Sequence, residues 1–247
     1  MSILFSGDFH ANAVNEIESI TKTKLQAEYT DKYNDIKYHI ILGDGGFEWH
    51  GNNTNDNFNY KALSQRPFPI LCVIGNHEPF LGMVNVPEID IGIGEKVCKI
   101  KDKPFIAYLK RGKIYTIDGF KMLVLGGALS IDKIRRVINI SWWENEYWSE
   151  QEKQEIFSLL GTDNTFDYVI SHTGPDHINK MLFRDFSVYS PKFADKVALL
   201  NDEIHDKINF IEWWSGHWHA DINYQDTKTG RIYRYLYRGT KVVEKRR

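Results

Sequence analysis

LCVIGNHEPF, residues 71–80, carries an apolar run straight into Gly-Asn-His-Glu, with a proline immediately after it. A short apolar run that stops at glycine and proline is typical of a buried strand. An ordinary loop can contain these polar residues by chance, whereas a metal site requires such ligands at the end of a strand. The deciding observation is therefore whether the same arrangement recurs along the chain.

Four further apolar runs end in the same way. They are SILFSGD, which leads to Asp8 and His10; YHIILGD, which ends at Asp44; FDYVISH, which ends at His172; and NFIEWWSGHWH, which holds His217 and His219. Parallel α/β sheets collect functional groups at the carboxyl ends of their strands. We therefore expect the five strand ends to form one site.

The residue types at these ends suit a pair of divalent metal ions. Two metals held about 3.5–4 Å apart need a bridging carboxylate and a mixture of nitrogen and oxygen ligands. Asp and His supply such ligands, and an Asn carbonyl oxygen adds a neutral one. Each motif alone is ordinary loop sequence, but five in one chain indicate a dinuclear site. Extended backbone at residues 217–219 would point His217 and His219 to the same side.

Helix and hairpin signals lie between the strands. Helices are expected at four places: residues 12–29, a short helix that Pro67 ends, residues 150–161 after the capping box of Ser149 and Glu152, and residues 192–207. Two hairpins are expected: one with a type I′ turn at Asp118-Gly119, and one over residues 221–239. Parallel-type strands interleaved with helices and hairpins predict a layered α/β sandwich, a single domain over residues 1–247.

Composition limits the environment and the partners. A net charge of −2 excludes a global field that would draw the protein to nucleic acid or an anionic membrane. The basic stretch at residues 228–247 is interpreted as a solvated edge and tail. Two cysteines give no disulfide framework, and no run approaches the ~20 apolar residues of a membrane span. A cytoplasmic protein without membrane partners is expected, and the pattern indicates no oligomeric state.

The ordered set GDFH, GD, GNHE, H and GHWH resembles the signature of the calcineurin-like metallophosphoesterases, over residues 8–219. The resemblance implies a two-sheet αβ sandwich with a dinuclear metal centre at the strand ends. It implies one metal held by Asp8, His10, Asp44 and His219, and a second held by Asp44, Asn76, His172 and His217, with Asp44 bridging. Two divalent ions are expected, with Mn²⁺ favoured and Fe²⁺, Ni²⁺ or Zn²⁺ as alternatives.

The resemblance also implies a mechanism, in which a metal-bridging hydroxide attacks phosphorus in line. His77 is expected to protonate the leaving oxygen or to stabilise the transition state, with Glu78 or Glu48 orienting it. Phe47 and Glu48 stand where related Ser/Thr protein phosphatases have Asp and Arg, and purple acid phosphatases have a ligand Tyr at the Phe47 position. Both subtypes are therefore disfavoured.

GGALSIDKIRRVINISWWENEYW, residues 126–148, resembles more loosely a segment of small bacterial and phage members of the family. Candidates to bind phosphate in place of the missing Arg are Lys133, Arg135 and Arg136, with a solvated basic loop as the alternative. Trp142 and Trp143 are expected to pack in the core or a lid rather than to stack on bases. His50, just past Asp44, is a further candidate for the substrate cleft.

A small phosphorylated metabolite or nucleotide is the leading substrate prediction, as a mono- or diester. A phosphoprotein comes second, because the Arg clamp is missing, and nucleic acid third, because the net charge is slightly negative. A non-catalytic binding scaffold on the same fold is the alternative of a different class. The presence of His77 together with all seven ligand positions argues against it.

Overall fold

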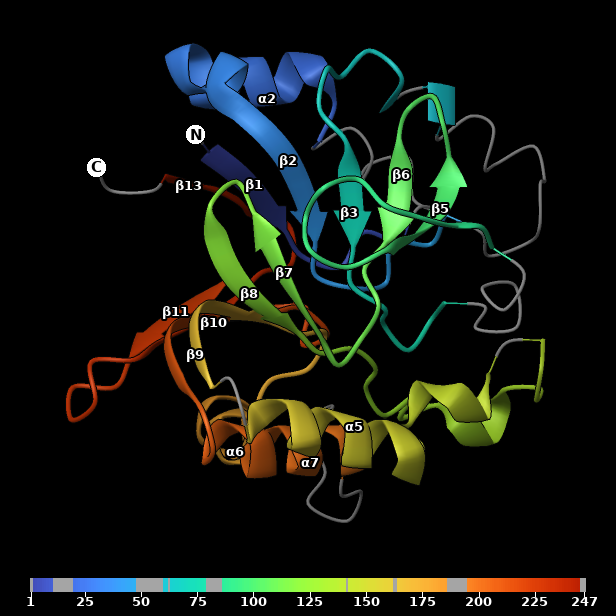
Figure 1. Cartoon of the computed structure of the whole chain (residues 1–247), viewed down its shortest axis with the longest axis vertical. Coiled ribbons are helices and arrows are strands. Elements are labelled where there is room, and N and C mark those ends of the chain that lie inside the picture. Colours follow the sequence, from blue (N-terminus) through green and yellow to red (C-terminus); the bar gives the residue numbers. More distant parts are fainter. Residues whose placement is uncertain are drawn as a thin grey trace.

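The apolar runs of the sequence form the inner strands of two facing sheets (Figure 1). The structure is a computed structural model that describes residues 2–10, 20–47, 60–61, 63–78, 86–140, 142–161, 164–185 and 195–244. The predicted two-sheet αβ sandwich is confirmed.

The first sheet has the strand order β13–β1–β2–β3–β6–β5–β4. Its strands are β1 (Ser2–Ser6), β2 (Ile36–Ile41), β3 (Ile70–Cys72), β4 (Glu88–Ile89), β5 (Val97–Lys101), β6 (Ile106–Tyr108) and β13 (Thr240–Glu244). The central strands β1, β2, β3 and β6 are mutually parallel, and antiparallel pairs complete both edges. The three parallel strands that precede candidate ligands therefore lie side by side.

The second sheet has the order β11–β12–β10–β9–β8–β7. Its strands are β7 (Lys113–Ile117), β8 (Phe120–Val124), β9 (Thr165–Ile170), β10 (Asn209–Ser215), β11 (Ile222–Gln225) and β12 (Ile232–Tyr235). Both predicted hairpins are confirmed, since β7 pairs with β8 and β11 with β12 in antiparallel register. Asp118 and Gly119 have φ of 49° and 81°, as a type I′ turn requires.

Successive side chains of an inner strand point to opposite faces of its sheet, and both faces are packed with apolar residues. In β3, Leu71 faces the core between the sheets, while Ile70 and Cys72 pack against the outer side. In β8, Met122 joins the same inter-sheet core and Leu123 faces the helices. Because both faces are buried, these strands are mostly apolar instead of alternating regularly with polar residues.

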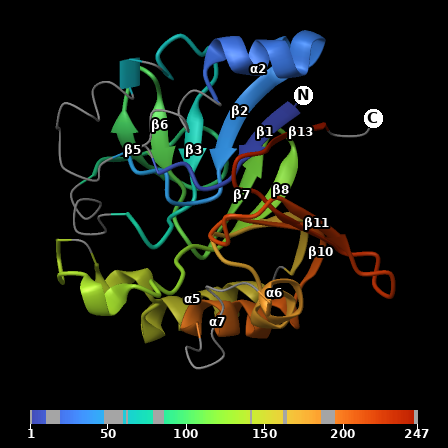
Figure 2. The same ribbon diagram turned by 180° about the vertical axis from the view of Figure 1, so that it is seen from behind.

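Helices cover the outer faces of the sandwich (Figure 2). The helix α2 (Lys22–Tyr29) lies over the first sheet, where Leu25 packs against β1 and β2. The helices α5 (Glu150–Leu160), α6 (Asp176–Phe183) and α7 (Lys196–His205) pack together on the second sheet. Short 3-10 turns are η1 (Thr30–Asp35), η2 (Lys133–Arg135) and η3 (Glu144–Glu146). None of the helices in the described part of the chain has the length and apolar character to span a bilayer.

Several element boundaries differ from the sequence-based expectation. The capping box at Ser149 and Glu152 is confirmed, and α5 ends at Leu160 before Gly161. The helix expected over residues 12–29 is described from Lys22 onward; residues 11–19 lie outside the described part, as do residues 192–194 before α7. The strands β4, β5, β6 and β13 and the helix α6 were not predicted from the sequence.

Candidate metal centre

The five predicted strand ends meet at one edge of the sandwich. The strands β1, β2 and β3 are parallel in the first sheet, and β9 and β10 are parallel in the second, so their carboxyl ends share an edge in each sheet. The imidazole of His172, after β9, donates from Nδ1 to the carbonyl of Leu42, after β2, at 2.8 Å. This contact joins the two sheets at the site.

The candidate ligands form two adjoining groups. In the first, Nε2 of His219 lies 3.2 Å from Oδ2 of Asp8 and 3.2 Å from Nε2 of His10. In the second, Nε2 of His172 lies 3.3 Å from Oδ2 of Asp44 and 2.9 Å from Oδ1 of Asn76. All four distances are 3.3 Å or shorter, so the atoms of each pair are close enough to share a cation.

Asp44 lies between the two groups, and His217 completes the second. Oδ2 of Asp44 is 3.9 Å from Nε2 of His10, while the rings of His172 and His217 have centroids 5.0 Å apart. The structure thus brings the seven predicted ligands to one place. Their binding of metal stays a prediction.

Both aspartates are oriented by backbone amides that leave one oxygen for a cation. The amide of His217 donates to Oδ1 of Asp8 at 2.6 Å, and the amide of His77 donates to Oδ1 of Asp44 at 2.8 Å. Oδ2 of Asp8 is buried, and although Nε2 of His219 lies 3.2 Å away, that contact lacks the geometry of a hydrogen bond. A buried carboxylate oxygen without a donor is costly, and a bound cation would satisfy it. The residues present therefore fit a divalent metal site.

Backbone conformation at the site is strained. Four candidate ligands have left-handed φ angles: His10 at 35°, Asp44 at 50°, His217 at 68° and His219 at 49°. Such angles cost energy in non-glycine residues and collect at functional sites. The expectation of extended backbone at residues 217–219 was wrong, because β10 ends at Ser215 and the chain bends after it. The bend sends His217 toward His172 and His219 toward His10.

Burial and neighbouring charges strongly shift the pKa values of several side chains in the cluster. Burial, with a smaller contribution from the neighbouring His172, lowers the pKa of His217 to about 3. Burial opposes protonation of His172 too, but the carboxylates of Asp44 and Asp8 raise its pKa to about 10. Burial tends to raise the pKa of Asp44, yet His172 and the other imidazoles hold it well below its usual range. The buried Asp44 carboxylate thus stays ionised among imidazoles, as a cation ligand must.

His77 lies beside the cluster and is contacted by an arginine. Its Nε2 is 3.9 Å from Oδ2 of Asp44, and Nη2 of Arg136 is 2.9 Å from the same imidazole nitrogen. Oδ1 of Asp132 holds Nε of Arg136 at 2.7 Å. Burial lowers the pKa of His77 to about 4, with Asp44 opposing and Arg136 adding to the shift.

Glu78 is fully buried, and its carboxylate spans two of the loops. Oε1 accepts from the amide of Gly45 at 2.7 Å, and Oε2 accepts from the amide of Gly75 at 2.5 Å. These bonds link the loop after β2 to the loop after β3. A role for Glu78 in orienting His77 stays a prediction; the hydrogen bonds assign it to holding the two loops together.

A buried polar chain supports Asn76. Its amide Nδ2 donates to Oγ of Ser130 at 3.0 Å, and that hydroxyl donates to Oε2 of Glu146 at 2.6 Å. Glu146 has no exposed surface. The chain fixes which end of the Asn76 amide faces His172, namely the carbonyl oxygen. Neither Ser130 nor Glu146 was predicted from the sequence.

The site opens into a cavity of about 370 Å³. Described residues that line it are His10, Asp44, Asn76, His77, Leu129, Ile131, Asp132, Arg136, His217, Trp218 and His219. The apolar wall formed by Leu129, Ile131 and Trp218 was not predicted. The Ser-x-Asp-Lys spacing was the sequence signal nearest to it.

The other substrate candidates lie in different surroundings. Arg136 lines the cavity, whereas Nζ of Lys133 lies 3.7 Å from the centre of the Trp142 ring. Arg135 is exposed and is not among the described residues that line the cavity. His50 lies outside the described residues, as does Glu48. Trp142 and Trp143 are buried, which confirms packing.

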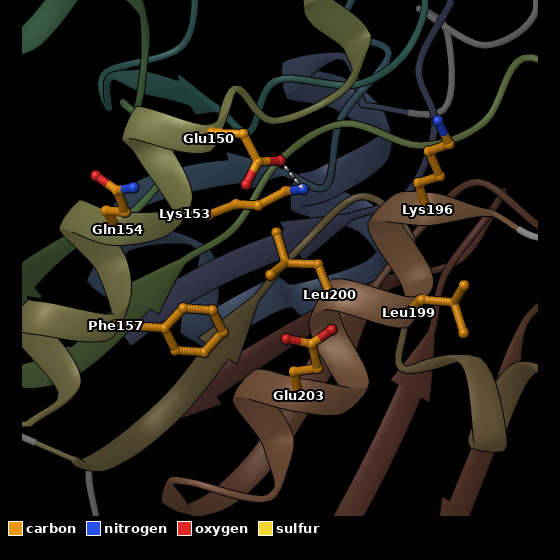
Figure 3. Close-up of a pocket in the computed structure, with 8 residues that line it drawn as sticks. All are labelled: Glu150, Lys153, Gln154, Phe157, Lys196, Leu199, Leu200 and Glu203. Atoms are coloured by element: carbon orange, nitrogen blue, oxygen red, sulfur yellow. Dashed lines mark hydrogen bonds and ion pairs between the residues drawn. The ribbon is translucent and has the colours of Figure 1, made fainter.

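A second hollow of about 670 Å³ lies between α5 and α7 (Figure 3). Its described lining consists of Glu150, Lys153, Gln154, Phe157, Lys196, Leu199, Leu200 and Glu203. Nζ of Lys153 pairs with Glu150 at 2.6 Å. That described lining contains no histidine or aspartate, so the candidate chemistry belongs to the smaller cavity.

Comparison with known families agrees with this geometry. A model of the calcineurin-like phosphoesterase family matches residues 1–221, and the chain belongs to that family. It is accordingly a metal-dependent phosphoester hydrolase. The family uses a dinuclear divalent metal centre, and the clustered aspartates and histidines supply candidate ligands for one.

Solved structures resemble the chain at low sequence identity. Phosphopantetheinyl hydrolase from Mycobacterium tuberculosis is 14% identical, with 96% of this chain and 90% of that chain covered and a TM-score of 0.48. A putative 5'-nucleotidase from Staphylococcus aureus is 13% identical, with 98% of this chain but 50% of that chain covered, at 0.48. Another solved chain is 11% identical, with coverage of 94% and 89% and a TM-score of 0.51, and this likeness shows the fold alone. No curated protein matched the chain.

Proposed function

We propose that the protein hydrolyses a phosphate ester of a small metabolite or nucleotide in the 370 Å³ cavity. The observation that carries this proposal is the convergence of Oδ2 of Asp8 and Oδ2 of Asp44 on clustered imidazoles, directly beside an arginine that lines the cavity. A cavity of this size suits a small ester rather than an extended polymer.

Two divalent cations would be held in the sequence-predicted grouping. Asp8, His10, Asp44 and His219 would hold the first; Asp44, Asn76, His172 and His217 would hold the second. When bound, the cations would activate water for attack and neutralise the phosphoryl oxygens. Mn²⁺ is the ion we propose first, because mixed nitrogen and oxygen ligands accept it and cellular supply decides among the alternatives.

Residues of the protein itself would position the ester and donate a proton to the leaving group. The guanidinium of Arg136 would bind two phosphoryl oxygens in the planar geometry that arginine offers. His77, which lies between Arg136 and Asp44, would donate to the leaving oxygen. A bound phosphate dianion beside His77 favours its protonated form. The ester oxygen therefore departs on the His77 side of the site.

The test measures release of p-nitrophenol from p-nitrophenyl phosphate and bis-p-nitrophenyl phosphate by metal-stripped protein, titrated with Mn²⁺, Ni²⁺, Zn²⁺ and Fe²⁺. Turnover should require metal, and His77→Ala and Asp44→Asn should each remove most of it while circular dichroism stays unchanged. His177→Ala is the matched control, since that half-exposed imidazole pairs with Asp202 on the helix side of the second sheet.

The assay distinguishes a hydrolase of small esters from a non-catalytic binding scaffold. Metal-dependent turnover that His77→Ala removes supports the hydrolase, and the preferred ester separates phosphatase from phosphodiesterase. Protein that binds metal with the expected ligands but turns over neither ester would argue against action on small esters. A binding scaffold would be indifferent to both substitutions.

A further inference from the structure

The segment that follows the cavity wall exposes an unusual number of aliphatic side chains. Five of the eight exposed large hydrophobic residues in the described part of the chain fall within residues 131–140. Their exposures are 55% for Ile131, 90% for Ile134, 55% for Val137, 53% for Ile138 and 69% for Ile140. Concentrated apolar surface of this kind marks a binding site more often than chance.

Hydrogen bonds and a ring contact hold the segment that carries these exposed side chains in place. The amide of Lys133 bonds to the carbonyl of Ser130, and the amide of Asn139 bonds to the carbonyl of Trp142 at 2.7 Å. The ammonium of Lys133 lies over the buried ring of Trp142. Backbone hydrogen bonds and the Lys133–Trp142 contact thus hold the segment in place, while its aliphatic side chains stay exposed to solvent against their usual preference.

The apolar segment is continuous with the cavity. Ile131 lines the cavity together with Leu129 and Trp218, yet it is more than half exposed. It therefore lies at the mouth, where the enclosed wall passes into the exposed segment. A ligand seated in the cavity would meet apolar surface as it emerges at Ile131.

The leaving group should emerge on this side. Arg136, from the same segment, contacts the imidazole of His77 through two nitrogens, at 2.9 and 3.1 Å. Under the proposed function, His77 donates a proton to the departing oxygen. The group attached to that oxygen must then pass the segment that carries Arg136 and Ile131.

We propose that Ile131 and the aliphatic side chains after it bind the apolar part of the leaving group. The preferred substrate is then a phosphate ester of an alcohol that carries an alkyl or aryl portion. This inference rests on the proposed function and deepens it. In the reaction, the bond between phosphorus and the ester oxygen breaks, water oxygen joins phosphorus, and a proton passes to the departing alcohol.

The experiment compares ethyl, butyl, hexyl and octyl phosphate, whose leaving alcohols differ little in acidity, by release of inorganic phosphate with Mn²⁺. Wild-type kcat/KM should rise about two- to fourfold per added methylene, as expected for partial to full burial of each. Ile131→Asn should flatten this dependence on chain length. Ile211→Asn is the matched control, because Ile211 is 57% exposed on β10, away from the ligand end of that strand.

A binding measurement separates failure of this inference from failure of the proposed function. The dissociation constants of metal-loaded protein for butyl-, hexyl- and octylphosphonate should fall with chain length in wild type and in Ile211→Asn, but not in Ile131→Asn. That result would support the apolar subsite even without turnover on any ester. Turnover or binding that is independent of chain length in wild type would overturn it. A dimer that Ile134→Asn dissolves would assign the aliphatic surface to a second copy and would also overturn it.

Discussion

The guanidinium of Arg136 lies against the imidazole of His77, with Nη2 2.9 Å from Nε2 and Nη1 3.1 Å from Nδ1. Asp132, four residues earlier, holds Nε of the same guanidinium at 2.7 Å. The side chain is thus fixed at the mouth of the cavity with its two terminal nitrogens directed at the catalytic candidate. This placement allows one arginine to contact a phosphoryl group and His77 together.

Replacing Arg136 should therefore impair catalysis strongly. We expect Arg136→Ala to lower kcat/KM about 10²–10³-fold, the usual cost of removing one preorganised donor to a developing charge. Arg136→Lys should recover only part of this loss, because an ammonium cannot bind two oxygens in a planar fork. Steady-state kinetics on p-nitrophenyl phosphate at saturating metal would measure both variants.

Arg135→Ala is the control for this prediction. Arg135 has the same charge and ends the same 3-10 turn, but it is exposed and does not appear among the described residues lining the cavity. If Arg135→Ala lost as much activity as Arg136→Ala, general positive charge on the segment would explain the effect. Specific contact from Arg136 would then be contradicted.

The Ser130 hydroxyl should control metal affinity through Asn76. Ser130→Ala removes the acceptor for Nδ2 of Asn76, so the amide loses the bond that directs its oxygen toward His172. Loss of an outer partner of a metal ligand typically costs about 10–100-fold in metal affinity. We expect isothermal titration with Mn²⁺ to show weakening of one of two binding events.

Ser2→Ala is the matched control, because Ser2 is also fully buried but its hydroxyl has no hydrogen-bond partner. Its removal should leave both binding events unchanged. Unaltered Mn²⁺ affinity in Ser130→Ala would mean that the amide of Asn76 is oriented by the cation itself. The Ser130–Glu146 pair would then serve only the packing of the loop.

The sequence predicted the parts of the structure that depend on local pattern. Buried parallel strands appear as mostly apolar runs, so β1, β2, β3, β9 and β10 were found with their polar ends. By contrast, β4 has two residues and β5 is mostly half-buried, so neither produces such a run. The helix α6 follows directly on the loop of His172. Those residues were interpreted only as the end of a strand, so the helix was not predicted.

At the site, ligand types were predictable but their supports were not. Asp8 and Asp44 could be identified because they follow apolar runs. The bond from Asn76 to Ser130 joins residues 54 apart in the chain, and no local pattern predicts such a pairing. The left-handed backbone at His217 and His219 was also missed. A strand that simply continued would favour extended backbone, but bringing both histidines into the cluster requires the chain to bend.

Gly75 should be intolerant of any side chain. A Cβ added there would lie 2.1 Å from Oδ1 of Asp44 and 2.4 Å from the backbone nitrogen of the same residue. Gly75→Ala must therefore displace the Asp44 carboxylate, and we expect loss of metal-dependent turnover together with weaker Mn²⁺ binding. Gly161→Ala is the control, because Gly161 has φ of −64° at the end of α5 and the nearest atom to an added Cβ would be the carbonyl oxygen of Ser158, at 3.3 Å. Normal Mn²⁺ binding by Gly75→Ala would contradict the predicted role of Asp44.

Asp195 should make the folded state less stable as pH rises. Its side chain caps α7 by accepting from the amide of Val197, and burial raises its pKa from 3.8 to about 6. Because the folded state holds this proton more tightly, its contribution to stability is full below pH 3.8 and falls by up to ~3 kcal/mol as pH rises to about 6. Asp195→Asn keeps a capping oxygen without ionising, so urea unfolding should show a gain over wild type at pH 7.5 that disappears at pH 4. Asp226→Asn should differ in sign, since the Thr229 hydroxyl lowers the pKa of that exposed carboxyl. An equal pH dependence in wild type and Asp195→Asn would show that Asp195 ionises at its ordinary pKa in the folded protein.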